Sequence, residues 1–218
     1  MLKVPDFFEK SFSQHYHCEG PENARYDFYV VNMGLLPVAV DRIIACDPLF
    51  YTGQEQTFAS TFPTGEFPVE LSIARIADDE RIGFARILFS TAAPVRWEMA
   101  GIEGDDVAAL EPDRIVGYSA DAGTGCFMDA KSAEAFLAFG GGINEIEENM
   151  TQITDGMEKT YQNTRSWLMW EKDGCGSAMF SAGWGDGYYA SYIGYDGDDK
   201  ICRLVTDFSL LDWPQTAE

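Results

Sequence analysis

Apolar side chains alternate with more polar ones along two neighbouring runs of this chain, residues 66–76 and 81–89. The alternating positions are Val69, Leu71 and Ile73 in the first run and Ile82 and Phe84 in the second. A period of two is typical of antiparallel strands with one buried face. The segment 77–80 between the runs is polar, so the sequence predicts a hairpin of two long strands.

Other short apolar runs bounded by turn residues extend this pattern over most of the chain. Further strands are predicted within 37–48 and over 56–62, 95–100, 114–119, 166–171, 177–183, 188–195 and 200–208. The last four are joined by "KDGCG", "WGDG" and "DGDD". Because Asp-Gly between apolar runs is a strong hairpin signal, we expect the C-terminal third to be one antiparallel meander.

Helical periodicity appears only in the middle of the chain. Asp129 is placed to cap a short helix over 130–139, which the glycines at 140–142 end. A longer amphipathic helix is predicted over 143–162, with an apolar stripe at Ile143, Ile146, Met150, Ile153, Met157 and Tyr161. We expect Ile146, Met150, Ile153 and Met157 to be buried against the sheet. The predicted fold class is α+β: mainly antiparallel β-sheet with one long amphipathic helix and a shorter capped helix in the middle of the chain.

The length of 218 residues fits a single domain. We expect one α+β domain over 31–218, with residues 1–30 as an N-terminal extension packed on it. The extension contains His15, Tyr16, His17 and Cys18. The two histidines and Cys18 could be zinc ligands, but a structural zinc site needs four ligands and no second cluster follows, so a surface strand or a frayed segment is the favoured interpretation.

Charge narrows the choice of partners. The chain carries 36 acidic and 15 basic residues, a net charge of −21. Such a field repels nucleic acid and anionic membranes and favours a basic protein partner. No apolar run is long enough for a membrane helix, and the N-terminus lacks a signal-peptide pattern, so we expect a cytoplasmic protein. The five widely spaced cysteines are expected to be reduced.

Two glycine-rich loops carry the residues that could form a site. They are "SADAGTGCFMDAK" at 119–131 and "GWGDGYY" at 183–189. The candidate site residues are Asp121, Gly123, Gly125, Asp129, Trp184, Asp186, Tyr188 and Asp207. The first loop could offer backbone N–H groups to an anion, but a tight strand-to-helix connection capped by Asp129 is the favoured interpretation.

Chemistry at these loops depends on whether they meet. If they do, Asp121, Asp129 and Asp186, with or without Asp207, could bind a divalent cation or act as acid and base. We expect the loops to approach each other but the aspartates to accept hydrogen bonds from turns and from the helix start, with no metal and no cofactor. Nucleophilic catalysis has little support, because His15 and His17 are the only histidines and there is no GxSxG motif.

Six motifs in order resemble a known bacterial family. They are "IIACDPL" (43–49), "FPTGEFPVELSIAR" (62–75), "VRWEMA" (95–100), "DAGTGCFMDA" (121–130), "GWGDGYY" (183–189) and "RLVTDF" (203–208). Together they resemble the family described as domain of unknown function 4241, over roughly residues 30–210. The resemblance implies a single domain that includes both glycine loops, and it carries over no catalytic residue.

Three functions follow from these observations as hypotheses. The first is a binding protein without catalysis, of the immunity or antitoxin type, that inhibits a basic toxin or nuclease. The second is a metal-dependent hydrolase that uses the aspartates of the two loops. The third is a ligand-binding module. Convergence of both loops into one pocket would favour the enzyme, and their separation over the surface would favour the inhibitor.

Overall fold

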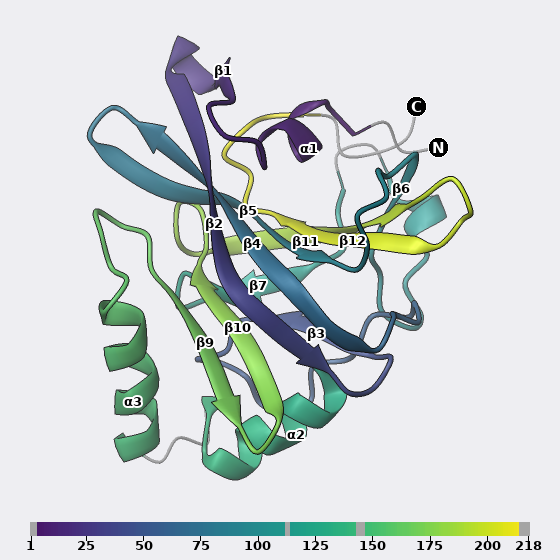
Figure 1. Cartoon of the computed structure of the whole chain (residues 1–218), viewed down its shortest axis with the longest axis vertical. Coiled ribbons are helices and arrows are strands. Elements are labelled where there is room, and N and C mark those ends of the chain that lie inside the picture. The colour runs from purple at the N-terminus through teal and green to yellow at the C-terminus, as the bar shows by residue number, and fades with distance from the viewer. Residues whose placement is uncertain (1–3, 112–113, 143–146, 214–218) are drawn as a thin grey trace.

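The computed structural model describes residues 4–111, 114–142 and 147–213, and these form two antiparallel sheets with helices on the outer faces (Figure 1). The large sheet has the order β1 (His17–Glu19), β2 (Arg25–Val38), β4 (Gly65–Ile76), β5 (Asp79–Leu88), β12 (Ile201–Asp207), β11 (Gly187–Tyr195) and β6 (Arg96–Met99), with β7 (Tyr118–Ala120) paired to β11. The small sheet has the order β3 (Ile43–Cys46), β8 (Thr124–Asp129), β10 (Cys175–Ser181) and β9 (Trp167–Lys172). The mainly antiparallel α+β class is confirmed.

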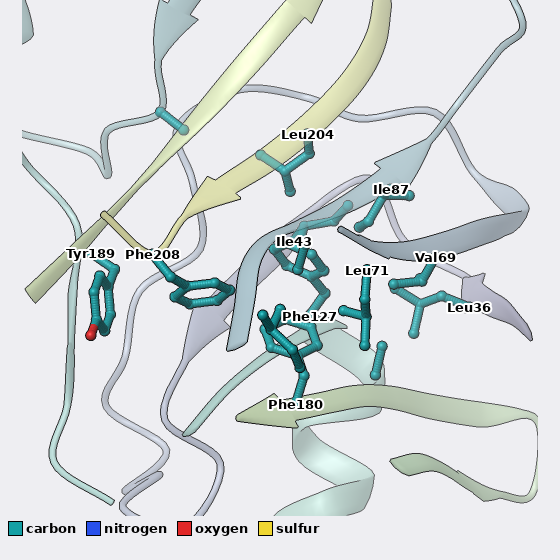
Figure 2. Packing of buried hydrophobic residues seen from close by; sticks show 14 of the residues in the cluster. Leu36, Ile43, Val69, Leu71, Ile87, Phe127, Phe180, Tyr189, Leu204 and Phe208 are labelled. Atoms are coloured by element: carbon teal, nitrogen blue, oxygen red, sulfur yellow. The ribbon is translucent and has the colours of Figure 1, made fainter. Parts of the chain in front are cut away.

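The main core lies between the inner faces of the two sheets. Figure 2 shows Phe127 and Phe180 of the small sheet beside Leu71 of the large sheet. The ring centroids of Phe127 and Phe180 are 5.3 Å apart in an edge-to-face arrangement, a geometry that aromatic pairs prefer. Alternate residues of β4 enter this core because their side chains point to the same face.

The outer faces of both sheets are also covered. Helices α2 (Ala130–Phe139) and α3 (Glu147–Glu158) pack against the small sheet, where Phe136 contacts Trp170 edge to face (Figure 1). The short helix α1 (Phe7–Lys10) places Phe8 on the outer face of the large sheet, against Tyr192 and Trp213. The N-terminal segment and the segment after β12 therefore complete a second apolar cluster.

The hairpin predicted over 66–76 and 81–89 is confirmed as β4 and β5. The single C-terminal meander is wrong. Strands β9 and β10 form a hairpin in the small sheet, whereas β11 and β12 form a hairpin in the large sheet. The loop between β10 and β11 carries the chain from one sheet to the other.

The helix predictions hold in part. Asp129 caps α2 by accepting the Ser132 N–H at 2.7 Å. The longer helix ends at Glu158 rather than 162, because Thr160 donates its hydroxyl to the Trp167 carbonyl and turns the chain towards β9. Met150, Ile153 and Met157 are buried as predicted, while Tyr161 is 53% exposed, and Ile143 and Ile146 lie outside the described residues.

Three other predictions differ from the structure in where a strand or the domain begins and ends. β2 continues through position 30, where we placed the domain boundary. The strand at 56–62 is wrong, since Phe58 forms only an isolated bridge to Ile102. The strand at 114–119 is reduced to β7. None of the described helices has the length and apolar character needed to cross a membrane.

Candidate functional site

The two glycine-rich loops meet at one corner of the molecule. Both carry the chain between the sheets, the first from β7 to β8 and the second from β10 to β11. The Ala182 N–H donates to the Gly123 carbonyl at 2.8 Å. β7 also pairs with the start of β11, with Ala120 opposite Gly187. The predicted approach of the loops is confirmed.

Glycine is required where the loops touch. Gly123 has a φ of +64°, and a Cβ there would lie 3.2 Å from the Gly185 Cα. Gly185 has a φ of +110°, a conformation that residues with a Cβ rarely adopt. A Cβ on Gly125 would lie 2.3 Å from the Tyr118 hydroxyl oxygen. Backbone conformation and close packing thus explain these glycines without a ligand.

Two aromatic side chains of the second loop are exposed. Trp184 and Tyr188 are 52% and 51% exposed. Arg81 lies over the Trp184 ring at 5.0 Å, and the Tyr188 hydroxyl accepts the Gly117 N–H at 3.0 Å. Each side chain therefore keeps a contact with the protein while about half of it remains exposed.

The four candidate aspartates do not come together. Asp121 accepts the Ser119 hydroxyl at 2.7 Å and, like Asp186, is exposed at the corner where the loops meet. Asp129 is at the opposite end of β8, about 20 Å from that corner by strand geometry. Its carboxylate accepts three backbone N–H groups, from Ala39, Val40 and Ser132, at 2.6–2.8 Å.

Asp207 belongs to a different environment. It is 1% exposed and accepts the Ser209 N–H at 2.8 Å and the Trp213 indole N–H at 2.7 Å. Burial raises the pKa of this carboxyl to about 6. The hydrogen bonds from Trp213 and Ser209 lower the pKa, but by less than burial raises it. Trp213 packs on the outer face of the large sheet, so Asp207 joins the C-terminal segment to that face. In the described part of the chain, no three histidine, cysteine or carboxylate side chains are grouped to hold a metal ion.

His15 and His17 of the N-terminal segment lie outside the loops. His17 and Cys18 are in β1, the edge strand of the large sheet, so the strand interpretation of this segment is confirmed for them. His15 precedes the strand with a φ of +68°.

Asp47 is a buried carboxylate at the first glycine loop that sequence reasoning missed. It follows β3 and is only 4% exposed. One oxygen accepts the Ala122 N–H at 2.6 Å, and the other accepts the Thr124 hydroxyl at 2.6 Å and the Leu49 N–H at 3.0 Å. Asp47 therefore holds the first glycine loop in place. Only the "CDP" turn at the end of a predicted strand marks it in the sequence.

A pocket of about 360 Å³ opens beside Asp47, and we call it the acidic pocket. It is lined by Ala45, Cys46, Asp47, Phe50, Gln54, Glu55, Gln56, Phe58, Ala100, Ile102, Asp105, Gly117, Tyr118, Ser119 and Asp121. This lining contains four carboxylates and no lysine, arginine or histidine. Apolar side chains such as Phe58 and Ile102 form part of the wall. The first glycine loop reaches the pocket through Asp121, and the second loop is not part of the lining.

The pocket carboxylates have no basic partner in the described structure. Their hydrogen bonds come from neutral groups: Glu55 accepts the Thr52 N–H at 2.9 Å, and Asp105 accepts the Ile102 N–H at 2.9 Å. Seven arginines pair with carboxylates elsewhere: Arg25, Arg75, Arg81, Arg86, Arg96, Arg165 and Arg203. None of these arginines lies in the lining of the pocket, so no basic side chain there offsets its four carboxylates.

Tyr118 separates the pocket from the core between the sheets. Its hydroxyl is buried with no hydrogen-bond partner among the described residues, beside Gly125. Burial raises the pKa of Tyr118 well above its ordinary value, so the side chain stays neutral and cannot add charge to the pocket.

Comparison with known proteins places the chain in context. A family model described as "Protein of unknown function (DUF4241)" matches residues 36–206, which include both glycine loops, Asp47 and the whole acidic pocket. Neither a curated protein nor a solved structure matches the chain. The match begins after α1 and β1 and ends before Trp213, so the outer cover of the large sheet lies largely beyond it.

Proposed function

We propose, from the premise that this chain belongs to the DUF4241 family of proteins of unknown function, that it is an acidic binding protein without catalysis that captures a basic segment of another protein. The observation that carries the proposal is the acidic pocket, whose four carboxylates have no basic partner within the described structure. A basic side chain from a partner would supply the missing positive charge.

The shape of the pocket fits a lysine or arginine side chain. Its volume of about 360 Å³ is at the small end for ligand sites, so it suits one side chain better than a large cofactor. Phe58 and Ile102 offer an apolar surface to the methylene stem, while Glu55 and Asp121 offer oxygens to the charged end. Arginine is the stronger candidate, because its planar group can bind two carboxylate oxygens at once.

The surroundings favour a protein over a small ligand. Phe50, a lining residue of the pocket, is 46% exposed, and Tyr188 binds Gly117 of the same lining. Exposed aromatic side chains near a charged pocket are typical anchors of protein interfaces. The net charge of −21 would speed the encounter with a basic partner. We place this function in the cytoplasm, with the protein as an immunity or antitoxin-type inhibitor of a basic toxin or nuclease.

Binding of a synthetic peptide of alternating glycine and arginine, measured by calorimetry at several salt concentrations, tests the proposal. The pocket variant is Glu55→Gln with Asp121→Asn. The matched control is Asp155→Asn with Glu158→Gln on α3, which lies against β9 at the opposite edge of the small sheet from β3. Both pairs remove two charges, but only the first removes them from the pocket.

We expect the pocket variant to weaken peptide binding about tenfold, as the loss of one or two charged hydrogen bonds would. The α3 variant should change it less than twofold. Equal losses in both variants, or no binding of the peptide, would overturn the proposal. If free arginine bound as tightly as the peptide, the protein would be a small-ligand module and not an inhibitor of a protein.

A further inference from the structure

Cys46 and Cys126 face each other across two strands of the small sheet. They are directly opposite in the antiparallel register of β3 and β8, and their sulfur atoms are 3.6 Å apart. They are separated by 80 positions in the sequence. Both side chains enter the cluster beneath α2, so they leave the sheet on the same face.

The strand geometry suits a covalent bond between them. The Ala130 N–H donates to the Arg42 carbonyl, and hydrogen-bonded pairs alternate along antiparallel strands from that pair. Cys46 and Cys126 are therefore a hydrogen-bonded pair, with Cα atoms about 5.5 Å apart. This separation is within the range of Cα distances that disulfides occupy. The Cβ atoms of a hydrogen-bonded pair lie about 5.5 Å apart, whereas a disulfide needs about 3.5–4.5 Å, so the bond requires a change of side-chain torsion and a small approach of the two strands.

Access to the two thiols differs. Cys46 lines the acidic pocket, although it is only 3% exposed, whereas Cys126 is fully buried. Of the two residues, Cys46 is therefore the one nearer to a small reagent in the pocket, and its sulfur, which packs beneath α2, reacts when this region opens locally. The Cys126 thiol is then already in contact with the sulfur that has reacted.

We propose that Cys46 and Cys126 are a dithiol that a hydroperoxide converts to a disulfide between β3 and β8. In the first step the Cys46 sulfur attacks the peroxide oxygen, which gives a sulfenic acid and releases water when hydrogen peroxide is the oxidant. In the second step the Cys126 sulfur displaces the hydroxyl group from Cys46, forms the S–S bond and releases a second water. The two thiols lose two electrons in total, which reduce the O–O bond.

The first step sets the rate. Burial raises the pKa of the Cys46 thiol well above its ordinary value, so the reactive thiolate is scarce at neutral pH. The rate should therefore rise about tenfold for each pH unit between 7 and 9. The second step is fast because the partner sulfur is already in place.

The bond would strengthen the frame of the first glycine loop. Cys46 precedes Asp47, which holds Ala122 and Thr124, and Thr124 is two residues from Cys126. A disulfide at this point would link β3 and β8, the two strands that position the first glycine loop. It would also constrain the unfolded chain by closing a long loop. This inference is independent of the proposed binding of a basic partner.

Treatment of the native full chain with hydrogen peroxide, followed by alkylation, trypsin and non-reducing mass spectrometry, tests it. Cleavage after Arg42, Arg75, Arg114 and Lys131 yields peptides 43–75 and 115–131, which contain Cys46 and Cys126. We expect a species that joins these two peptides, with its mass lowered by two hydrogens, and a rise in Tm of about 5–10 °C that a reductant reverses. The half-exposed Cys18 reports the reactivity of a thiol outside the pair.

Two variants complete the test. Cys126→Ala should stop at a sulfenic acid on Cys46, which dimedone labels, and should lose the peroxide-dependent rise in Tm. Cys202→Ala removes another buried thiol and should leave both signals unchanged. Oxidation of the wild-type chain that never joins peptides 43–75 and 115–131, at any pH from 7 to 9, would overturn the proposal. A joined species that formed equally fast at pH 7 and pH 9 would overturn its first step.

Discussion

Gly123 lies against Gly185 so closely that a Cβ on Gly123 would come within 3.2 Å of the Gly185 Cα. The contact joins the two connections that carry the chain between the sheets. Because backbone packs on backbone here, the glycine content of both loops has a structural cause. Groups that can bind a partner at this corner are therefore side chains around the glycines, above all the carboxylates of the acidic pocket.

Replacing Gly123 tests this packing. Gly123→Ala should lower the free energy of unfolding by about 2–3 kcal/mol, from the left-handed backbone and the added contact with Gly185. Gly174→Ala is the matched control, because Gly174 also has a positive φ, +77°, but its added Cβ would meet nothing within 4 Å. It should cost about 1 kcal/mol. Equal costs in urea unfolding would show that the loops do not pack as described.

Asp47 should contribute more to stability than Asp121 or Asp186, the two predicted site residues at the corner where the loops meet. Asp47→Asn leaves one oxygen and turns an N–H₂ group towards the half-buried Ala122 N–H or the buried Thr124 hydroxyl, both of which are donors. We expect a loss of about 2–4 kcal/mol. The exposed Asp186→Asn should cost about 1 kcal/mol or less. Urea unfolding of the two variants measures the difference, and a larger loss at Asp186 would contradict it.

Divalent cations should have no specific effect on stability. Asp121 and Asp186 lie at the corner, while Asp129 and Asp207 bind N–H donors elsewhere, so the four cannot share one ion. Magnesium, calcium and manganese should therefore leave Tm unchanged in a thermal-shift titration. A saturable, ion-specific rise that Asp186→Asn removes would restore the hydrolase hypothesis.

The stripe of α3 is a third element of the fold that can be tested. Ile153 is 1% exposed within the cluster between α3 and the small sheet. Ile153→Asp should unfold the domain or nearly so, because it buries an unpaired charge. Gln152→Asp places the same charge on the exposed face of the same helix and should change stability by about 0.5 kcal/mol or less. Similar melting of both variants would exclude the stripe from the core.

Local patterns predicted the elements better than their arrangement. The strands β4 and β5 follow from alternation, because which face a side chain occupies depends only on its place along the strand. Membership of a sheet depends on distant partners. β10 and β11 are buried on both faces for most of their length, so neither shows the alternation that would mark its outer side. The change of sheet between them was therefore hidden.

The residues of the candidate site also differ in how well the local sequence predicts them. Gly123 and Gly185 stand out in the sequence because few other residues tolerate their conformations. Asp47 does not, because its partners Ala122 and Thr124 are 75 and 77 positions away. Asp129 was correctly predicted as a helix cap, but its bonds to Ala39 and Val40 depend on how β2 meets α2. Tertiary hydrogen bonds of this kind leave no local pattern.

Asp207 should give the protein an unusual dependence on pH. Burial raises the pKa of its carboxyl to about 6 in the folded state, from 3.8, so between about pH 4 and 6 the folded chain binds the proton more tightly than the unfolded chain. The contribution of Asp207 to stability is therefore complete below pH 4 and is lost as pH rises through 6, by about 3 kcal/mol in all. Asp79 and Glu80 act in the opposite direction. Burial raises the pKa of each carboxyl, but hydrogen bonds and ion pairs outweigh it and lower the pKa, so only a comparison with a variant isolates Asp207.

Asp207→Asn, compared with the wild-type chain by urea unfolding at pH 4, 5, 6 and 7, provides that comparison. The stability advantage of the wild-type chain should grow by about 2–2.5 kcal/mol as pH falls from 7 to 4, because the unfolded carboxyl is partly protonated at pH 4. The exposed Asp212→Asn is the matched control and should show no such trend. A difference that stayed constant would mean that the Trp213 and Ser209 donors offset the effect of burial on the Asp207 carboxylate, and one that grew as pH rose would mean that they outweigh it. The direction of the slope thus decides which of the two effects dominates at this junction between β12 and the C-terminal segment.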